Sequence, residues 1–282
     1  MTVARNVLRP GSIAEAVTAV SQDGAVPLAG ATWVMRAALR GETLAGAYVA
    51  LRDIPELRQV EVRENEISIG AAITHAELAA SLQRVRGCGG LVQAAAQAAN
   101  PAIRRVATVG GNLCSVAFAA SDLVPALLAA GAEVEIQDAR GAARRPVEAF
   151  LAERAALPPG WLLTRAFARY AARLSAHARL PLRKAGDYPV AIVSVSLERT
   201  EDGCARSARV AVGSVEPVAR RWPVLEQARE GRPIVPGAAA DLARERTGDF
   251  AGRDGVEAPG WYRTQVLPSL VRSAFESLQA QV

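Results

Sequence analysis

The sequence predicts an α+β protein of two domains, and three features of the chain carry this prediction. Helix and strand signals alternate through residues 1–150, and a Pro-Pro-Gly cluster at 158–160 then indicates a linker. Beyond it, apolar and polar residues alternate on both sides of a turn at 200–203, which is typical of an antiparallel hairpin with one buried face. We therefore expect a first domain over 1–165, with parts at about 1–53 and 54–165, and a second domain over 166–282.

The first part opens with a capping box at Ser12 and Glu15, which starts a helix with an apolar face. A short strand is expected over 25–29. After a glycine-containing turn comes a helical pattern over 34–40, which Gly41 ends. A second short strand follows at 48–51.

The second part begins near residue 54 with a hairpin over 60–69. Glycines and β-branched residues crowd positions 106–113, so we expect a strand and then a loop there. A further strand is expected over 132–136. The remaining helices of the chain are expected at about 74–84, 91–99, 122–130, 222–230, 238–247 and 259–279.

The composition argues against several classes of protein. Half of the 282 residues are apolar and 22% are charged, which is ordinary for a globular chain. The net charge of +5 comes from scattered Arg residues and aromatics make up only 5%, unlike most nucleic-acid-binding proteins. The apolar stretch 123–132 is too short for a bilayer span, and the first residues lack a signal-peptide core, so we expect a cytoplasmic protein. The three cysteines stand far apart with no nearby histidine, so we expect no metal site.

Two glycine-centred loops are the candidate ligand-binding segments. A strand-to-helix turn of this kind leaves main-chain N–H groups free to bind a phosphate, although each loop could equally be an ordinary turn. Neither loop has the GxGxxG spacing of a Rossmann site, so the residues alone indicate a possible nucleotide binder. The first loop contains Ala29, Gly30, Ala31, Thr32 and Trp33. The second contains Thr108, Gly110, Gly111 and Asn112, followed by the hydroxyl of Ser115.

Asp122 follows the second loop and precedes an apolar helix. It is either a first-turn acid worth roughly 1 kcal/mol of helix stability or a ligand for a ribose hydroxyl. The two histidines, His75 and His177, form no legible arrangement with a nucleophile, so a hydrolytic mechanism has little support. Tyr188 could belong to a turn or lie against a flat ring.

These segments, in this order, resemble the FAD-binding medium subunits of the xanthine dehydrogenase and carbon monoxide dehydrogenase family. The resemblance covers nearly the whole chain, and the second loop, which matches the family's IR…TIGGN motif, is its most specific part. The similar segments are 28–32, 69–78 (IGA-x-x-TH-x-EL), 103–113, 122–128, 183–188 (R-[RK]-x-x-D), 213–217 (G-x-V-x-P) and 261–263.

The resemblance implies a FAD-binding fold of the vanillyl-alcohol-oxidase/PCMH type in two subdomains, followed by a smaller α+β domain with an antiparallel sheet and helices. It implies that residues 30–32 and 110–112 cradle the FAD diphosphate and that Asp122 holds the adenosine ribose. The segment 179–188, with Lys184 and Asp187, would approach the isoalloxazine ring. It implies no catalytic residue and no metal ligand in this chain.

Partner subunits are also implied by the resemblance. A large subunit would carry a molybdopterin-type molybdenum cofactor and hydroxylate the substrate, and a small subunit with two [2Fe–2S] clusters would pass electrons to FAD. The absence of clustered cysteines here agrees with clusters held elsewhere. A dimer of such heterotrimers is one assembly of this kind. The substrate and the terminal electron acceptor are not indicated.

Three positions depart from the family pattern. Ala31 replaces the usual second glycine of the first loop, and alanine would cost roughly 1 kcal/mol if that position has a positive φ. The interval from Asn112 to Asp122 lacks the usual proline and is one residue longer, and Arg179 stands where relatives often carry Lys. Two alternatives therefore stay open: a stand-alone FAD oxidase or dehydrogenase, and a scaffolding subunit that has lost its flavin.

Overall fold

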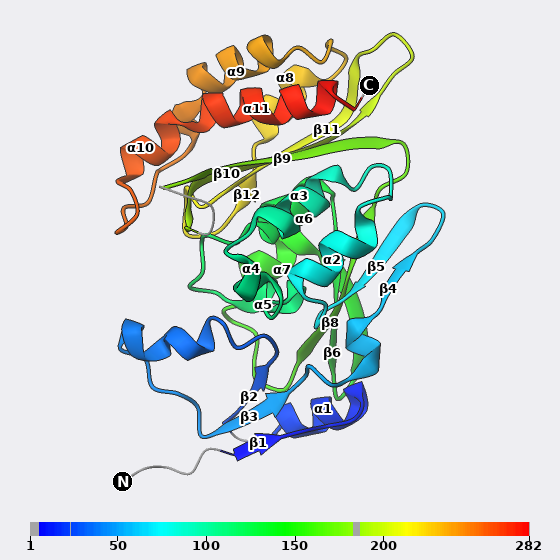
Figure 1. The fold of residues 1–282 in the computed structure, drawn as a ribbon, viewed down its shortest axis with the longest axis vertical. Helices are drawn as coiled ribbons and strands as arrows, with labels where there is room; N and C mark the ends of the chain where they lie inside the picture. The colour runs from blue at the N-terminus through cyan, green and yellow to red at the C-terminus, as the bar shows by residue number, and fades with distance from the viewer. Residues whose placement is uncertain (1–5, 23, 183–186, 282) are drawn as a thin grey trace.

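The protein is described by a computed structural model for residues 6–22, 24–182 and 187–281. Within these ranges the strands form a three-stranded, a five-stranded and a four-stranded sheet. Figure 1 shows these sheets following one another along the long axis, with the three-stranded sheet at the N-terminal end. Helices α8, α9 and α11 cover the far side of the four-stranded sheet (Figure 1). The expected α+β class is confirmed.

The three-stranded sheet is parallel and is ordered β1-β3-β2. Its strands are β1 (Asn6–Leu8), β2 (Ala25–Leu28) and β3 (Ala47–Ala50). Helix α1 (Ile13–Val20) packs on it, and the Ser12 hydroxyl caps that helix by accepting from the N–H of Glu15 at 3.2 Å. The expected helix after the first loop is a 3-10 helix, η1 (Val34–Arg40), and Gly41 ends it with a φ of 69°.

The five-stranded sheet is antiparallel and is ordered β4-β5-β8-β6-β7. The expected hairpin at 60–69 is confirmed as β4 and β5. The 158–160 cluster leads into β8 of this sheet, so the change of sheet falls after β8 rather than at that cluster. The strands are β4 (Val60–Val62), β5 (Glu66–Gly70), β6 (Glu133–Asp138), β7 (Gly141–Pro146) and β8 (Leu162–Arg169).

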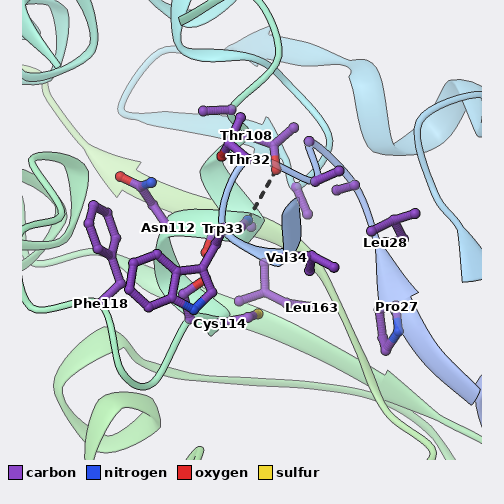
Figure 2. Close-up of a pocket in the computed structure, with 18 of the residues that line it drawn as sticks. Pro27, Leu28, Thr32, Trp33, Val34, Thr108, Asn112, Cys114, Phe118 and Leu163 are labelled. Carbon is purple, nitrogen blue, oxygen red and sulfur yellow. Dashed lines mark hydrogen bonds between the residues drawn. The ribbon is translucent and has the colours of Figure 1, made fainter. Parts of the chain in front are cut away.

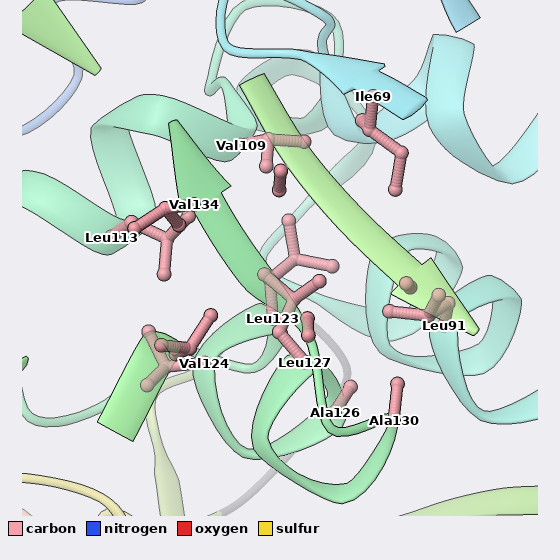
Figure 3. Close-up of a cluster of buried hydrophobic side chains, with 14 of the residues drawn as sticks. Ile69, Leu91, Val109, Leu113, Leu123, Val124, Ala126, Leu127, Ala130 and Val134 are labelled. Carbon is pink, nitrogen blue, oxygen red and sulfur yellow. The ribbon is translucent and has the colours of Figure 1, made fainter. Parts of the chain in front are cut away.

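Six helices and the 3-10 helix η2 (Pro55–Arg58) accompany this sheet within the described residues. Together with the sheet they enclose an apolar core that includes Leu113, Leu123, Leu127 and Val134, with Leu113 beside Val134 (Figure 3). The helices are α2 (His75–Leu82), α3 (Gly89–Gln97), α4 (Pro101–Arg104), α5 (Val109–Cys114), α6 (Leu123–Ala129) and α7 (Val147–Glu153).

The strand and loop expected at 106–113 are wrong, because the chain forms α5 there. Thr108 caps this helix: its hydroxyl accepts a hydrogen bond from the Gly111 N–H at 3.1 Å. Val109 and Leu113 then share a fully buried face. The low helix propensity of this glycine-rich segment is overridden by the cap and by this buried contact.

The second domain pairs its strands antiparallel in the order β12-β11-β10-β9. The expected hairpin around 200–203 is confirmed, with Val195 opposite Val210. The expected single final helix is two, α10 (Gly260–Gln265) and α11 (Leu267–Gln279), because Pro268 has no N–H to continue the helix across the junction. The other elements are β9 (Arg173–Pro181), β10 (Pro189–Arg199), β11 (Ala205–Gly213), β12 (Arg220–Arg221), α8 (Pro223–Arg229), α9 (Pro236–Glu245) and η3 (Thr247–Asp249).

None of the helices that the structure describes combines the length and the apolar character needed to cross a bilayer.

Candidate functional site

A cavity of about 960 Å³ lies where the three sheets meet. Its volume is at the upper end of the range for small-molecule sites, so it can take a ligand larger than a single ring system. Both expected loops lie in its wall, and so do the start of β10 and the end of β9. The expected site residues that line it are Ala29, Gly30, Ala31, Thr32, Trp33, Thr108, Gly110, Gly111, Asn112, Ser115, Asp122 and Asp187. The remaining one, Lys184, lies outside the described residues.

The first loop forms an open nest of donors. Ala31 has a φ of 57°, in the left-handed region that L-residues other than glycine rarely adopt. This conformation turns the chain sharply, and the N–H groups of residues 30–33 find no acceptor among the described residues. The carbonyl of Ala31 accepts from the Met35 N–H at 2.8 Å, which closes the turn into η1. A concave run of unpaired N–H groups is suited to an anion such as a phosphate.

Gly30 brings the two loops into direct contact. A Cβ atom at this position would lie 2.1 Å from the carbonyl oxygen of Val106 and 3.0 Å from the Cα of Ala107. Any side chain would therefore force the first loop away from the segment that leads into the second. The glycine is needed here for the packing of protein on protein, and this packing fixes how far apart the two loops stand.

The second loop offers side chains rather than main-chain donors. The N–H of Gly110 donates to Ala71 O at 2.8 Å, and the N–H of Gly111 is held by the Thr108 hydroxyl. Asn112 lies on the cavity wall (Figure 2), and its Oδ1 accepts from the Ser121 hydroxyl at 2.7 Å. This bond fixes the amide plane, so that the Asn112 NH₂ group is held in one orientation.

A buried polar network joins the second domain to the cavity. The Asp122 carboxylate is 4% exposed, and its Oδ1 accepts from Arg179 Nε at 2.8 Å. His177 Nε2 lies 3.3 Å from the same oxygen, and His177 Nδ1 lies 2.8 Å from the Ser194 hydroxyl. Arg179 Nη2 also donates to the Asp187 carbonyl at 2.9 Å. Arg179, which stands where relatives often carry Lys, thus bonds to two partners at once through separate N–H groups, whereas a lysine would offer one ammonium group on a flexible side chain.

Three aromatic rings from separate parts of the chain meet at the same end of the cavity. Trp33 and Phe118 have centroids 4.9 Å apart (Figure 2), and Phe118 and Tyr188 have centroids 5.4 Å apart. The guanidinium of Arg40 lies 3.9 Å from the Trp33 centroid, and Arg36 contacts the Tyr188 hydroxyl. These rings, tilted against one another by 42° and 63°, form an aromatic cluster at this end of the cavity.

Two titratable groups of the cavity wall are neutral near pH 7. Burial lowers the pKa of His75 to about 4, although the Asp122 carboxylate and the Thr108 backbone act in the opposite direction. Burial also raises the pKa of the Cys114 thiol to about 12, which removes it as a nucleophile. No group of three His, Cys, Asp or Glu side chains within the described ranges is placed to share a metal ion.

The apolar half of the cavity wall was expected only in part, because the sequence singled out the segment that leads into the first loop but neither Trp161 nor Leu163. Pro27 and Leu28 lie at the opposite side of the view from Phe118 (Figure 2), and Leu163 and Trp161 also line the cavity. These residues sit in or beside ordinary strands, and their sequence carries only the signal of buried strand positions.

Comparisons with known proteins agree with this geometry. Residues 3–167 match the FAD binding domain in molybdopterin dehydrogenase. Residues 176–278 match the CO dehydrogenase flavoprotein C-terminal domain. The gap between the two matches, residues 168–175, contains the turn from the five-stranded sheet to the four-stranded sheet.

The xanthine dehydrogenase FAD-binding subunit of Escherichia coli O157:H7 is 35% identical over 103 residues, covering 36% of this chain and 35% of that subunit. The nicotinate dehydrogenase FAD-subunit of Eubacterium barkeri is 33% identical over 93 residues, covering 33% of this chain and 31% of that subunit. The alignments thus span about a third of the length of these curated relatives.

Among solved structures, a reconstituted CO dehydrogenase from Oligotropha carboxidovorans contains a chain that matches with a TM-score of 0.89 and 25% identity. The match covers 99% of this chain and 98% of the other. The expected fold, a FAD-binding domain followed by a smaller domain with an antiparallel sheet, is confirmed. Because the first family match extends over more than half of the sequence, the protein belongs to the family of flavoproteins that carry the FAD-binding domain of molybdopterin dehydrogenases.

Proposed function

We propose that this chain is the flavoprotein subunit of a molybdenum hydroxylase and that it holds FAD in the cavity where the three sheets meet. One observation carries the proposal: four consecutive N–H groups, at residues 30–33, have no acceptor within the described chain and lie in a loop that lines a cavity of about 960 Å³. Unpaired main-chain donors favour an anion, and a cavity of this volume suits a dinucleotide better than a mononucleotide. The residues present therefore fit the group that the family implies.

The chemistry of the wall suggests how the parts of FAD are distributed. The diphosphate would lie on the nest at 30–33, with the hydroxyl of Thr32 and the side chain of Asn112 as further donors. The isoalloxazine would lie at the aromatic end, near Trp33 and Tyr188. The adenine would lie at the other end, against Pro27 and Trp161.

The contact between Asp122 and Arg179 bears on the role of the carboxylate. The resemblance implies the adenosine ribose for Asp122 and the isoalloxazine for the 179–188 segment, but the two side chains are only 2.8 Å apart. In an extended FAD the adenosine ribose lies far from the isoalloxazine ring. The ion pair of Asp122 with Arg179 can therefore contact only one of these two groups. We place Asp122 at the isoalloxazine end, because Arg179 also bonds to Asp187 and Tyr188 follows directly in the aromatic cluster.

When bound, FAD supplies redox chemistry that can take up electrons singly and release them in pairs. This chain positions the cofactor and controls its surroundings. Arg179 holds the Asp122 carboxylate and the Asp187 carbonyl in place at one end of the cavity, the aromatic cluster limits the access of water, and the two loops hold the anionic part. We assign no catalytic residue to the chain. Substrate oxidation would take place in a partner subunit.

The cofactor assignment is tested by adding FAD to the purified chain. A flavin absorption band near roughly 450 nm should co-elute with the protein. Titrations with riboflavin and FAD then measure what the diphosphate and the adenosine add together, because the two ligands share the flavin ring. We expect FAD to bind at least about 100-fold more tightly, the effect of two charge-assisted phosphate contacts. Equal affinities, or no flavin binding at all, would contradict the proposal, and the latter result would favour the flavin-less scaffold.

We propose that the partners are a large molybdenum-cofactor subunit and a small [2Fe–2S] subunit, assembled in the cytoplasm, with a dimer of heterotrimers as one candidate assembly. The named relatives support this, because they are subunits of dehydrogenases. Affinity purification of the tagged full chain from its native host, followed by molybdenum, iron and flavin analysis, tests the assembly. A flavoprotein that turns over substrate without these partners would instead favour the stand-alone oxidase.

A further inference from the structure

His75 is a cavity-lining side chain that the flavin site described above does not use. It begins α2 and is 3% exposed, and neither of its ring nitrogens hydrogen-bonds to a described residue with ordinary geometry. Its main-chain N–H donates to Ala107 O at 3.0 Å, which fixes it beside the start of the second loop. His177 shows the contrast, because both of its ring nitrogens have partners.

A buried imidazole whose polar contact with the Thr108 backbone is poorly aligned is costly, because it has given up its hydrogen bonds to water and gained no well-aligned bond from the protein. The fold nevertheless keeps His75 in the wall of the ligand cavity, beside the start of the second loop, where burial lowers the pKa of its imidazole more than the Asp122 carboxylate raises it. The ring is neutral near pH 7, so it carries one N–H donor and one acceptor. Its N–H donor can therefore serve an anion bound in this part of the cavity.

We propose that His75 is a positioning residue for the cofactor, whose imidazole forms a hydrogen bond with the diphosphate of bound FAD, directly or through one water molecule. The inference rests on the proposed function, and it adds to the nest a donor that no loop motif marks. Both ring nitrogens are covered in this structure, so the ring must rotate toward the cavity before it can contact the diphosphate directly or through one water molecule. His75 would then add a side-chain donor to that of Asn112, since the main-chain N–H groups of Gly110 and Gly111 in the second loop are already used.

Two substitutions separate this role from a purely structural one. His75→Leu removes both ring nitrogens at similar volume, and His75→Gln keeps a polar group able to donate. We expect His75→Leu to raise the Kd for FAD roughly tenfold, the effect of one lost hydrogen bond, and His75→Gln to stay within about threefold of the native protein. Without FAD, His75→Leu should unfold at the same or a higher temperature, because it deletes unpaired buried polar atoms. An unchanged Kd, or a loss of ligand-free stability that parallels the loss of affinity, would overturn the inference.

A spectroscopic measurement on the unmodified protein does not depend on the folding of any variant. The chain has two histidines, so ring-¹⁵N labelling gives few signals, and His75→Gln assigns them. ADP, which carries the diphosphate, should shift the His75 ring nitrogens and raise the pKa of the imidazole, whereas riboflavin should leave both unchanged. If FAD binds and the His75 signals do not respond to ADP, the inference fails while the cofactor assignment stands. If FAD does not bind, the proposed function fails first.

Discussion

Ala31→Gly tests the strained turn on which the first loop depends. With a φ of 57°, Ala31 holds its Cβ against the following carbonyl, which costs about 1–2 kcal/mol relative to an unstrained residue. Glycine avoids this cost but loses about 0.4–1 kcal/mol through the greater freedom of the unfolded chain. The free energy of unfolding should therefore rise by about 0.5–1 kcal/mol.

Ala38→Gly is the matched control for this substitution. Ala38 is exposed and lies in η1, so the same chemical change should lower the free energy of unfolding by about 0.5–1 kcal/mol. Urea denaturation of the two flavin-free variants should therefore shift the midpoint in opposite directions. If Ala31→Gly is destabilised as much as Ala38→Gly, the left-handed conformation at this loop does not exist, and the reasoning about the nest is refuted. FAD affinity should change little, because the strain is present with and without ligand.

Further predictions concern the loop contact, the helix cap and the buried imidazole. Gly30→Ala should lower the free energy of unfolding by more than about 2 kcal/mol and weaken FAD binding, as measured by denaturation and flavin titration, because its Cβ would lie 2.1 Å from Val106 O. Thr108→Val should cost about 1 kcal/mol by removing the cap on Gly111, while Thr108→Ser should retain most of it; equal losses would argue against the cap. Burial lowers the pKa of His75 from 6.5 in the unfolded chain to about 4 in the folded protein, so between pH 4 and pH 6.5 the unfolded chain binds more protons than the folded protein. Stability should fall by up to about 3 kcal/mol as pH drops through this window, and a His75→Leu curve that keeps the same slope would contradict this cause.

Features with a local physical signal could be predicted from the sequence. Capping residues located the start of α1 and of α2, Gly41 located the end of η1, and alternation located the β10–β11 hairpin. The predictions failed where tertiary contacts outweigh propensity. Helix α5 forms in a segment rich in glycine because Val109 and Leu113 gain a buried apolar surface.

The site divides in the same way. Its polar loops are rich in glycine and hydroxyl-bearing residues, so the residues alone indicated a phosphate-binding site, and the resemblance to a known family supplied FAD as its ligand. The ion pair of Asp122 with Arg179 joins positions far apart in the chain and depends on how the two domains pack, which no local pattern encodes. The isolated imidazole of His75 is equally invisible in the sequence, because being buried without a partner is a property of the assembled core.

The cavity wall draws on both domains, since Arg179 and Tyr188 lie beyond the last strand of the FAD-binding domain. A flavin bound there would contact both domains and stabilise the state in which they are packed together. At a free concentration 100 times its Kd, a ligand stabilises the state that binds it by about 2.7 kcal/mol. Opening of the connection between β8 and β9 would therefore become rarer when FAD is bound, and a protease would cleave this connection more slowly. If the rate of cleavage near residue 171 is the same with and without saturating FAD, the packing of the two domains does not depend on FAD.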